Sequence, residues 1–360
     1  MVVVTVNHRL NVFGYLNVAE VGGDPSSGSA GVQDLVLALE WVKDNIAGFG
    51  GDPGCVTTFG QSGGGAKSGL VMTMPSAKGL VHRAIVESGP TLTVGDPAAA
   101  AALTRRIMAK LGVSTIQGLQ AAPYQALLDA SADIRWEPVL DGLAIQRHPF
   151  EPTAHPQIAN IPVLVGCTSD EMTLYNVGRD WWSNMTEADV AARLRPHYGD
   201  QTGAILAAAK RQWPKDSPRY LYTGVLSQAM FIDSAKLTER KAAQGAPVYS
   251  YVWEWHAPVE GGLLRAPHSV EVGFVFDNVD KGPMLLGREP STLALGKAVS
   301  SAWTAFARTG DPNVAGSTLP RWPRFTPERR ATMMFNTKSR IAENPYAELR
   351  ALMPNPVMIF

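Results

Sequence analysis

The residues best suited to covalent chemistry lie in a run of glycines, Gly60-Gln61-Ser62-Gly63-Gly64. An apolar strand pattern at residues 56–59 precedes this run, and small residues typical of a helix follow it. A serine at such a strand-to-helix turn is the nucleophile of an elbow with a strained backbone. We expect side chains at Gly60 and Gly64 to collide with the crossing strand and helix, so glycine permits the turn. Gly63 then offers its backbone N–H at a helix N-terminus, where it stabilises a developing oxyanion.

A second interpretation of the same glycines is a phosphate-binding or purely structural turn. A Walker loop needs Gly-Lys-Ser/Thr, and Lys67 stands outside the glycine cluster. A Rossmann fingerprint needs a different glycine spacing. A Ser-x-x-Lys pair is also missing, because no lysine of the sequence has a serine three residues before it. The pattern therefore favours a nucleophile over a phosphate cradle.

An alcohol at neutral pH needs a general base, and the base needs an acid that orients it. In folds built around this turn, the chain order is nucleophile, acid, base. Three histidines come late enough to be the base: His197, His256 and His268. His197 lies in a helical stretch, and His256 ends a strand. His268 lies in a loop after the late strand, so its position favours it as the base.

The acid is expected at the end of a strand that precedes the histidine. Residues 161–167 form such a strand pattern, and Asp170 and Glu171 follow it. From spacing alone, either carboxylate can serve. We expect neither a metal nor a cofactor, because the sequence holds no His-Glu-x-x-His and no Cys-x-x-Cys.

The elements that must position these residues alternate between strand and helix, which is typical of α/β proteins with a mostly parallel sheet and helices on both faces. The β-branched run at residues 2–6 predicts a buried strand. Helix-rich insertions are expected at about residues 97–135 and 186–244, and the whole chain, 1–360, is interpreted as one domain. The remaining predicted elements are strands at 56–59, 83–86, 161–167, 248–255 and 332–335, and helices at 62–74, 291–308 and near Ala347.

Composition narrows the partners of the chain. The 32 basic residues balance 32 acidic ones, so no basic face indicates nucleic acid. No apolar run approaches the ~18 residues of a membrane span. Cys55 and Cys167 are the two cysteines, which excludes a disulfide framework. A small molecule is the expected binding partner, and the oligomeric state stays open. The sequence shows no signal peptide pattern, so the cytoplasm is the default location.

Several separate motifs resemble the type-B carboxylesterases, which include cholinesterases and bacterial para-nitrobenzyl esterases. The likeness runs nearly from end to end. It is carried by Val4-Thr5-Val6-Asn7-His8-Arg9-Leu10, Gly31-Val32-Gln33-Asp34, Phe49-Gly50-Gly51-Asp52-Pro53, Ile85-Val86-Glu87-Ser88-Gly89 and Phe306-Ala307-Arg308-Thr309-Gly310-Asp311-Pro312-Asn313.

This resemblance implies an α/β-hydrolase fold and hydrolysis of carboxylic esters through an acyl-enzyme. It implies Glu171 rather than Asp170 as the acid, and His268 as the base. Two positions depart from the family pattern. Gln61 stands where the family usually has glutamate, which removes a charge and is expected to spare the reaction. Met172 stands where the family has glycine, which is expected to affect the loop more than the chemistry.

The family also carries a His-Gly-Gly-Gly stretch upstream of its Val-Asn-Tyr-Arg strand, and this sequence starts after that point. We therefore expect an N-terminally truncated family member that lacks its first strands and keeps only Gly63 as an oxyanion donor. Each lost donor costs about 10²–10³ in rate, so turnover is expected to fall by roughly 10⁴. Two alternatives follow: a weakly active or inactive fragment, and a cholinesterase-like binding protein without catalysis.

Overall fold

A computed structural model of the chain describes residues 1–356, and these divide into two compact units. The first unit holds residues 1–58, 67–82 and 91–160, and the second holds residues 59–66, 83–90 and 161–356. Strand β1 (Thr57–Gln61) and helix α3 (Gly63–Val71) run across this division. Every residue predicted to do chemistry lies in the second unit. The prediction of one domain over 1–360 stays a prediction.

The first unit consists of helices joined by long loops. Its core contains Val12, Ile107, Met108, Leu119 and Ala130. The three helices α4 to α6 fall within the stretch 97–135 that was predicted to be helical. The helices of this unit are α1 (Asn11–Tyr15), α2 (Ala30–Asn45), α4 (Pro97–Leu111), α5 (Ile116–Ala121) and α6 (Tyr124–Ala130).

The strand predicted for residues 2–6 is wrong. These residues have no regular secondary structure, and Val2, Val3, Val4 and Val6 are exposed. A strand needs a neighbour that accepts and donates its backbone hydrogen bonds. In the described residues, the sheet contains β1 to β6 and does not include this run. The β-branched pattern has the composition of a strand, but it does not supply a pairing partner.

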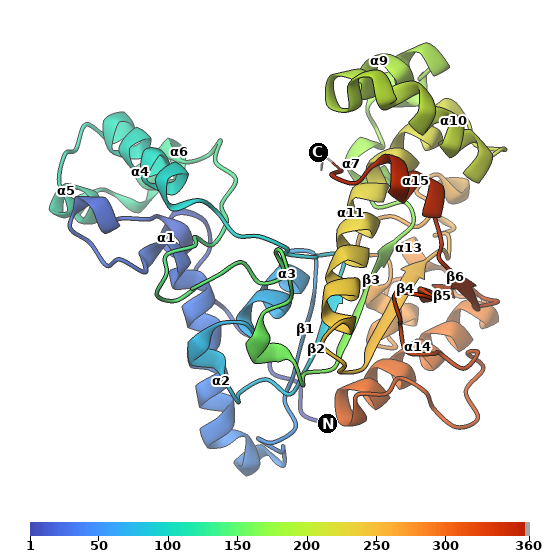
Figure 1. Ribbon diagram of the computed structural model, residues 1–360, viewed down its shortest axis with the longest axis horizontal. Coiled ribbons are helices and arrows are strands. Elements are labelled where there is room, and N and C mark those ends of the chain that lie inside the picture. The colour runs from blue at the N-terminus through green and yellow to red at the C-terminus, as the bar shows by residue number, and fades with distance from the viewer. Residues whose placement is uncertain (357–360) are drawn as a thin grey trace. The chain divides into compact units, whose positions relative to one another are not determined.

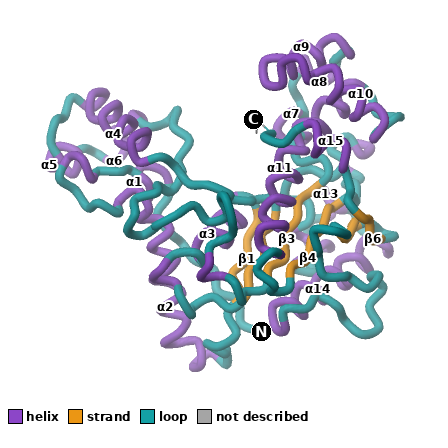
Figure 2. Tube along the Cα trace, viewed as in Figure 1, coloured by secondary structure: helices purple, strands orange, loops and turns teal. Residues whose placement is uncertain are grey.

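A six-stranded sheet in the order β1-β2-β3-β4-β5-β6 carries the site (Figures 1 and 2). The pairs β2–β3, β3–β4 and β4–β5 are parallel, and β5–β6 is antiparallel. This confirms the mostly parallel sheet predicted from the sequence. The strands after β1 are β2 (Arg83–Glu87), β3 (Val163–Thr168), β4 (Val248–Trp253), β5 (Ala331–Phe335) and β6 (Arg340–Glu343).

Helices cover both faces of this sheet, and the second unit supplies them. The stretch predicted as a helical insertion at 186–244 contains α9, α10 and the long α11. The helices are α7 (Thr173–Asn176), α8 (Asp180–Ser183), α9 (Glu187–Tyr198), α10 (Thr202–Gln212), α11 (Pro218–Ala242), α12 (Val272–Val275), α13 (Pro283–Leu286), α14 (Pro290–Thr309) and α15 (Ala347–Leu352).

Strand β4 shows how the two faces are filled. Its side chains alternate between faces, as the two-residue period of a strand requires. Tyr251 packs in one core with Trp303 of α14, their ring centroids 5.4 Å apart. Val252, the next residue, packs in the other core with Val225 of α11. The central strands are therefore buried on both sides, which fixes the strand ends where the site residues emerge.

Candidate active site

Ser62 occupies the turn between β1 and α3. Its φ is +58°, a left-handed conformation that non-glycine residues rarely adopt. Two backbone hydrogen bonds hold the turn: the Ser62 N–H donates to the Glu87 carbonyl at 2.8 Å, and the Ala66 N–H donates to the Ser62 carbonyl at 2.9 Å. Gly63 is the first residue of α3, and helix N-termini favour negative charge. The strand, strained serine and helix have the geometry that a nucleophile elbow requires.

The glycines around this turn are not equivalent. A Cβ on Gly60 would lie 2.5 Å from the Gly64 carbonyl carbon, so the turn excludes a side chain there. A Cβ on Gly64 would have no other atom within 4 Å, so the prediction of a collision at that position is wrong. The space around that position is open, so a methyl group at residue 64 meets no neighbouring atom. Gly65 and Gly89 are crowded instead, with a Cβ placed 2.7 Å from the Glu87 carbonyl oxygen and 2.0 Å from the Ser62 carbonyl oxygen, respectively.

This difference gives a stability prediction with an internal control. Gly60→Ala is expected to lower the free energy of unfolding by about 1–3 kcal/mol, because backbone must move to admit the methyl group. Gly64→Ala is expected to be neutral or to stabilise by up to about 1 kcal/mol, because alanine is the better helix former. Urea unfolding followed by circular dichroism measures both. Equal destabilisation by the two substitutions would contradict the geometry of the turn.

Glu171 emerges beyond the end of β3 and is almost fully buried. Its Oε1 accepts hydrogen bonds from the Thr168 backbone N–H at 2.7 Å and from the Ser88 hydroxyl at 2.5 Å. Its Oε2 contacts Nδ1 of His268. Asp170, the alternative that spacing left open, does not make this contact and instead lies near Arg265, at 3.6 Å. The structure thus brings Glu171 and His268 together.

His268 lies in the loop between β4 and α12, with its side chain 6% exposed. The ring of Tyr175 packs against the imidazole at a centroid distance of 5.7 Å. The other two histidines are placed differently: His197 is exposed on α9, and His256 is about half exposed, 3.9 Å from Asp170.

The partners of its two ring nitrogens indicate which nitrogen of His268 carries the proton, and Gln61 is one of these partners. Its Nε2 lies 3.0 Å from Nε2 of His268. The Glu171 carboxylate only accepts, so Nδ1 carries the proton that faces it, and the unprotonated Nε2 can accept from the Gln61 amide. This is the tautomer that a general base needs, with an unprotonated Nε2 beside the residue that precedes Ser62.

Two further acids are buried behind the Glu171 carboxylate. The hydroxyl of Ser88 also lies 3.4 Å from Oε1 of Glu271. Burial raises the pKa of Glu271 well above its ordinary value, and the charges of Glu171 and Glu87 add to the effect. Burial likewise raises the pKa of Glu87 to about 7, although a hydrogen bond from the Trp303 indole at 2.6 Å lowers that pKa in part. The raised pKa of Glu271 favours its protonated form, which lowers the charge repulsion within this buried cluster.

The sequence motifs include Ser88 only within the stretch Ile85–Gly89, and no motif described above includes Glu271. The position of Ser88 in the sequence could have indicated its contact with Glu171. Ser88 directly follows β2, and Thr168, which also binds Glu171, is the last residue of the neighbouring strand β3. Parallel strands bring such residues to one edge of the sheet. Glu271, in contrast, reaches the cluster from a loop, which strand order alone does not reveal.

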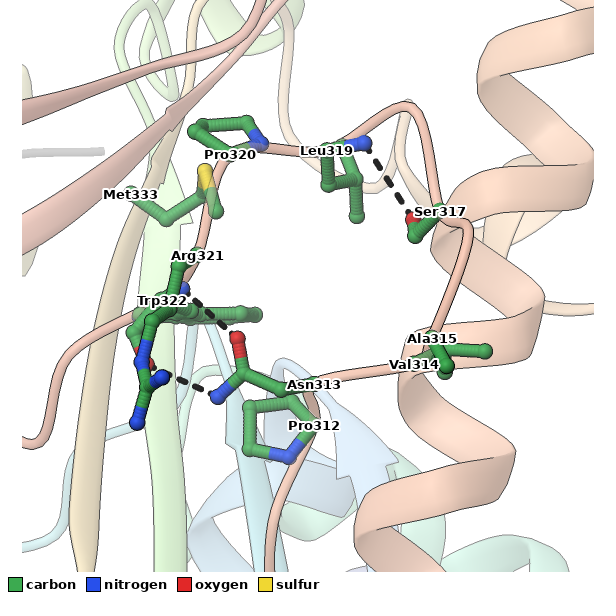
Figure 3. A pocket seen from close by; sticks show the side chains of 10 residues that line it. All are labelled: Pro312, Asn313, Val314, Ala315, Ser317, Leu319, Pro320, Arg321, Trp322 and Met333. Atoms are coloured by element: carbon green, nitrogen blue, oxygen red, sulfur yellow. Dashed lines mark hydrogen bonds between the residues drawn. The ribbon is translucent and has the colours of Figure 1, made fainter.

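A pocket of about 300 Å³ lies elsewhere, in the loop of residues 312–322 (Figure 3). Its lining does not include Ser62, Glu171 or His268. The Asn313 side chain spans the loop, accepting from the Trp322 N–H at 2.7 Å and donating to the Trp322 carbonyl at 2.9 Å. Those bonds give Asn313 a structural role. Within residues 1–356, no group of three His, Cys, Asp or Glu side chains is placed to hold a metal, and no helix is long and apolar enough to cross a membrane.

The strained serine turn lies in a mostly parallel sheet with helices on both faces, and comparison with known proteins gives the family of the chain. The chain belongs to the carboxylesterase family, whose sequence model matches residues 1–352. It is 29% identical to the para-nitrobenzyl esterase of Bacillus subtilis (strain 168), over 97% of this chain and 72% of that protein. It is also 29% identical to the phenmedipham hydrolase of Pseudarthrobacter oxydans, over 93% and 69%.

Among solved structures, the carboxylesterase EST55 of Geobacillus stearothermophilus, at pH 6.2, superposes with a TM-score of 0.84. The two chains are 33% identical, and the match covers 96% of this chain and 74% of that one. The carboxylesterase family and the α/β-hydrolase fold predicted from the sequence are therefore confirmed.

Proposed function

We propose that this chain hydrolyses carboxylic esters with Ser62 as nucleophile, His268 as general base and Glu171 as the acid that orients it. The observation that carries the proposal is the placement of His268. One ring nitrogen faces a buried carboxylate, and the other lies at the residue next to a serine held in a strained strand-to-helix turn. Family membership supports ester hydrolysis as the reaction class.

The proposed reaction has two halves. Ser62 Oγ attacks the ester carbonyl carbon while Nε2 of His268 takes the hydroxyl proton, and Glu171 stabilises the imidazolium that forms. The Gly63 N–H donates to the oxyanion of the tetrahedral intermediate. Collapse expels the alcohol, which receives the proton from His268. Water then attacks the acyl-enzyme while His268 takes its proton, and collapse breaks the bond from the acyl carbon to Ser62 Oγ, which receives that proton as the carboxylic acid leaves.

Gln61 has a defined part in this scheme. Its amide holds the imidazole in the required tautomer before the reaction, and the Ser62 hydroxyl must take over the same ring nitrogen for proton transfer. The 360 residues contain no His-Gly-Gly-Gly stretch, so the proposal keeps the expectation of slow turnover by these residues alone. A small ester is the substrate class. The names of two relatives make para-nitrobenzyl esters and phenmedipham the first probes.

The proposal is tested by covalent labelling together with turnover of p-nitrophenyl butyrate. A fluorophosphonate is expected to modify one residue per chain, Ser62, as identified by mass spectrometry of the peptide that contains it. The fraction of chains labelled is expected to equal the fraction of hydrolysis lost. Modification of a different residue, or hydrolysis that persists after complete labelling of Ser62, would overturn the proposal.

A further inference from the structure

We propose that Arg265 is a positioning residue, which holds the loop carrying His268 against the turn carrying Glu171. The inference rests on the proposed function, because it takes these two residues as the base and its orienting acid. Three sets of contacts support this inference. They are an ion pair to the segment just before α11, an ion pair to the turn after β3 that holds Asp170 and Glu171 (the acid turn), and hydrogen bonds to the backbone on either side of Arg265.

The first set joins Arg265 to Asp216, which lies two residues before α11, and to Tyr220 in the first turn of that helix. Its guanidinium donates to both carboxylate oxygens of Asp216, each at 2.7 Å. The same group stacks over the ring of Tyr220, 3.6 Å from its centroid. The Arg265 side chain is only 19% exposed and that of Asp216 only 13%. A bidentate, stacked and mostly buried guanidinium is rigid, so it fixes its loop to α11.

The second set joins Arg265 to the acid turn. Nη1 lies 3.6 Å from Oδ1 of Asp170, the residue immediately before Glu171. Burial raises the pKa of Asp170, while a hydrogen bond from Ser169 at 2.6 Å and the positive charge of Arg265 lower it. Arg265 thus shares its charge between two buried carboxylates that belong to different segments.

The third set fixes the backbone around Arg265, whose φ is +54°. The Ala257 N–H donates to the Arg265 carbonyl at 2.7 Å, and the Asp170 N–H donates to the Ala266 carbonyl at 3.2 Å. The Thr173 hydroxyl donates to the Leu264 carbonyl at 2.6 Å. The turn that carries Glu171 and the loop that carries His268 are thereby joined within four residues of His268.

Removal of the guanidinium leaves Asp170 and Asp216 without their common cation. Buried carboxylates that lose a partner move toward water or take up a proton, and the loop must follow. A displacement of about 1 Å between catalytic groups can cost about 10²-fold in rate. Arg265 is therefore expected to affect kcat through the His268–Glu171 contact while leaving substrate affinity nearly unchanged.

The test compares Arg265→Met, Arg265→Lys and a control, Arg329→Met. Methionine keeps the length that packs on Tyr220, and lysine keeps the charge without the bidentate fork. Arg329 pairs with Glu343 at 2.6 Å, and both side chains are more than half exposed. On p-nitrophenyl butyrate, Arg265→Met is expected to lower kcat about 10²-fold with KM nearly unchanged. Lysine is expected to give an intermediate kcat, and the control a kcat like that of the unsubstituted chain.

A second measurement does not depend on turnover. The proton between His268 Nδ1 and Glu171 is expected to give a far-downfield proton resonance in the unsubstituted chain and in Arg329→Met. The resonance is expected to broaden or disappear in Arg265→Met while circular dichroism shows a folded protein. An unchanged resonance and an unchanged kcat in folded Arg265→Met would overturn the positioning role. Hydrolysis undiminished in Ser62→Ala would instead overturn the proposed function, so the two failures are distinguishable.

Discussion

Ser62→Ala is expected to reduce kcat for p-nitrophenyl butyrate by about 10⁴-fold or more, to the level of the uncatalysed reaction. Alanine removes the only atom of residue 62 that can form the acyl-enzyme. In serine hydrolases that keep their oxyanion hole, a residual acceleration survives loss of the nucleophile. In these 360 residues, Gly63 is the one donor that we assign to that hole, so little residual acceleration is expected.

Two comparisons make this result decisive. Ser301→Ala removes an exposed hydroxyl on α14 and is expected to keep the unsubstituted rate. Circular dichroism and urea unfolding are expected to show a folded Ser62→Ala chain, because alanine replaces serine without added volume. If folded Ser62→Ala keeps more than about a tenth of kcat, another residue is the nucleophile.

The sequence was most informative where burial on both faces dictates residue type. Five of the six strands of the sheet were predicted, because buried parallel strands form continuous apolar runs such as residues 161–167 and 248–255. Strand β6 was missed, since Arg340–Glu343 is a short edge strand with exposed charged ends and no apolar signal. The strand predicted at residues 2–6 failed for the opposite reason, because it has the signal but no partner.

The site residues, too, were predictable where a local sequence pattern places them and not where a contact depends on distant segments. Ser62 and Glu171 follow strands closely, so local pattern placed them, and the family resemblance selected Glu171 over Asp170. The contacts of Gln61 and Arg265 were not predictable in this way. Gln61 reaches across to a histidine 207 residues later in the chain, and Arg265 joins two segments through Asp216 and Asp170. Such contacts depend on loop paths, which periodicity does not encode.

The second large effect is expected from Glu171→Gln, with a loss of about 10⁴-fold in kcat. Two donors fix how the new amide must sit. The Thr168 N–H and the Ser88 hydroxyl both donate to the oxygen at the Oε1 position, so the glutamine carbonyl must occupy it. The amide NH₂ then takes the Oε2 position and donates toward Nδ1 of His268. Nδ1 must accept, which moves the imidazole proton to Nε2.

That protonated nitrogen faces the Gln61 amide and cannot take a proton from Ser62, so the variant holds the inactive tautomer. Hydrolysis of p-nitrophenyl butyrate measures the loss, and Glu343→Gln, at an exposed ion pair with Arg329, is the matched control with an expected rate like that of the unsubstituted chain. The far-downfield resonance assigned to Nδ1–H is expected to vanish in Glu171→Gln and to remain in the control. A folded Glu171→Gln chain within about tenfold of the unsubstituted kcat would show that a different carboxylate orients His268, because loss of the orienting acid costs far more than that.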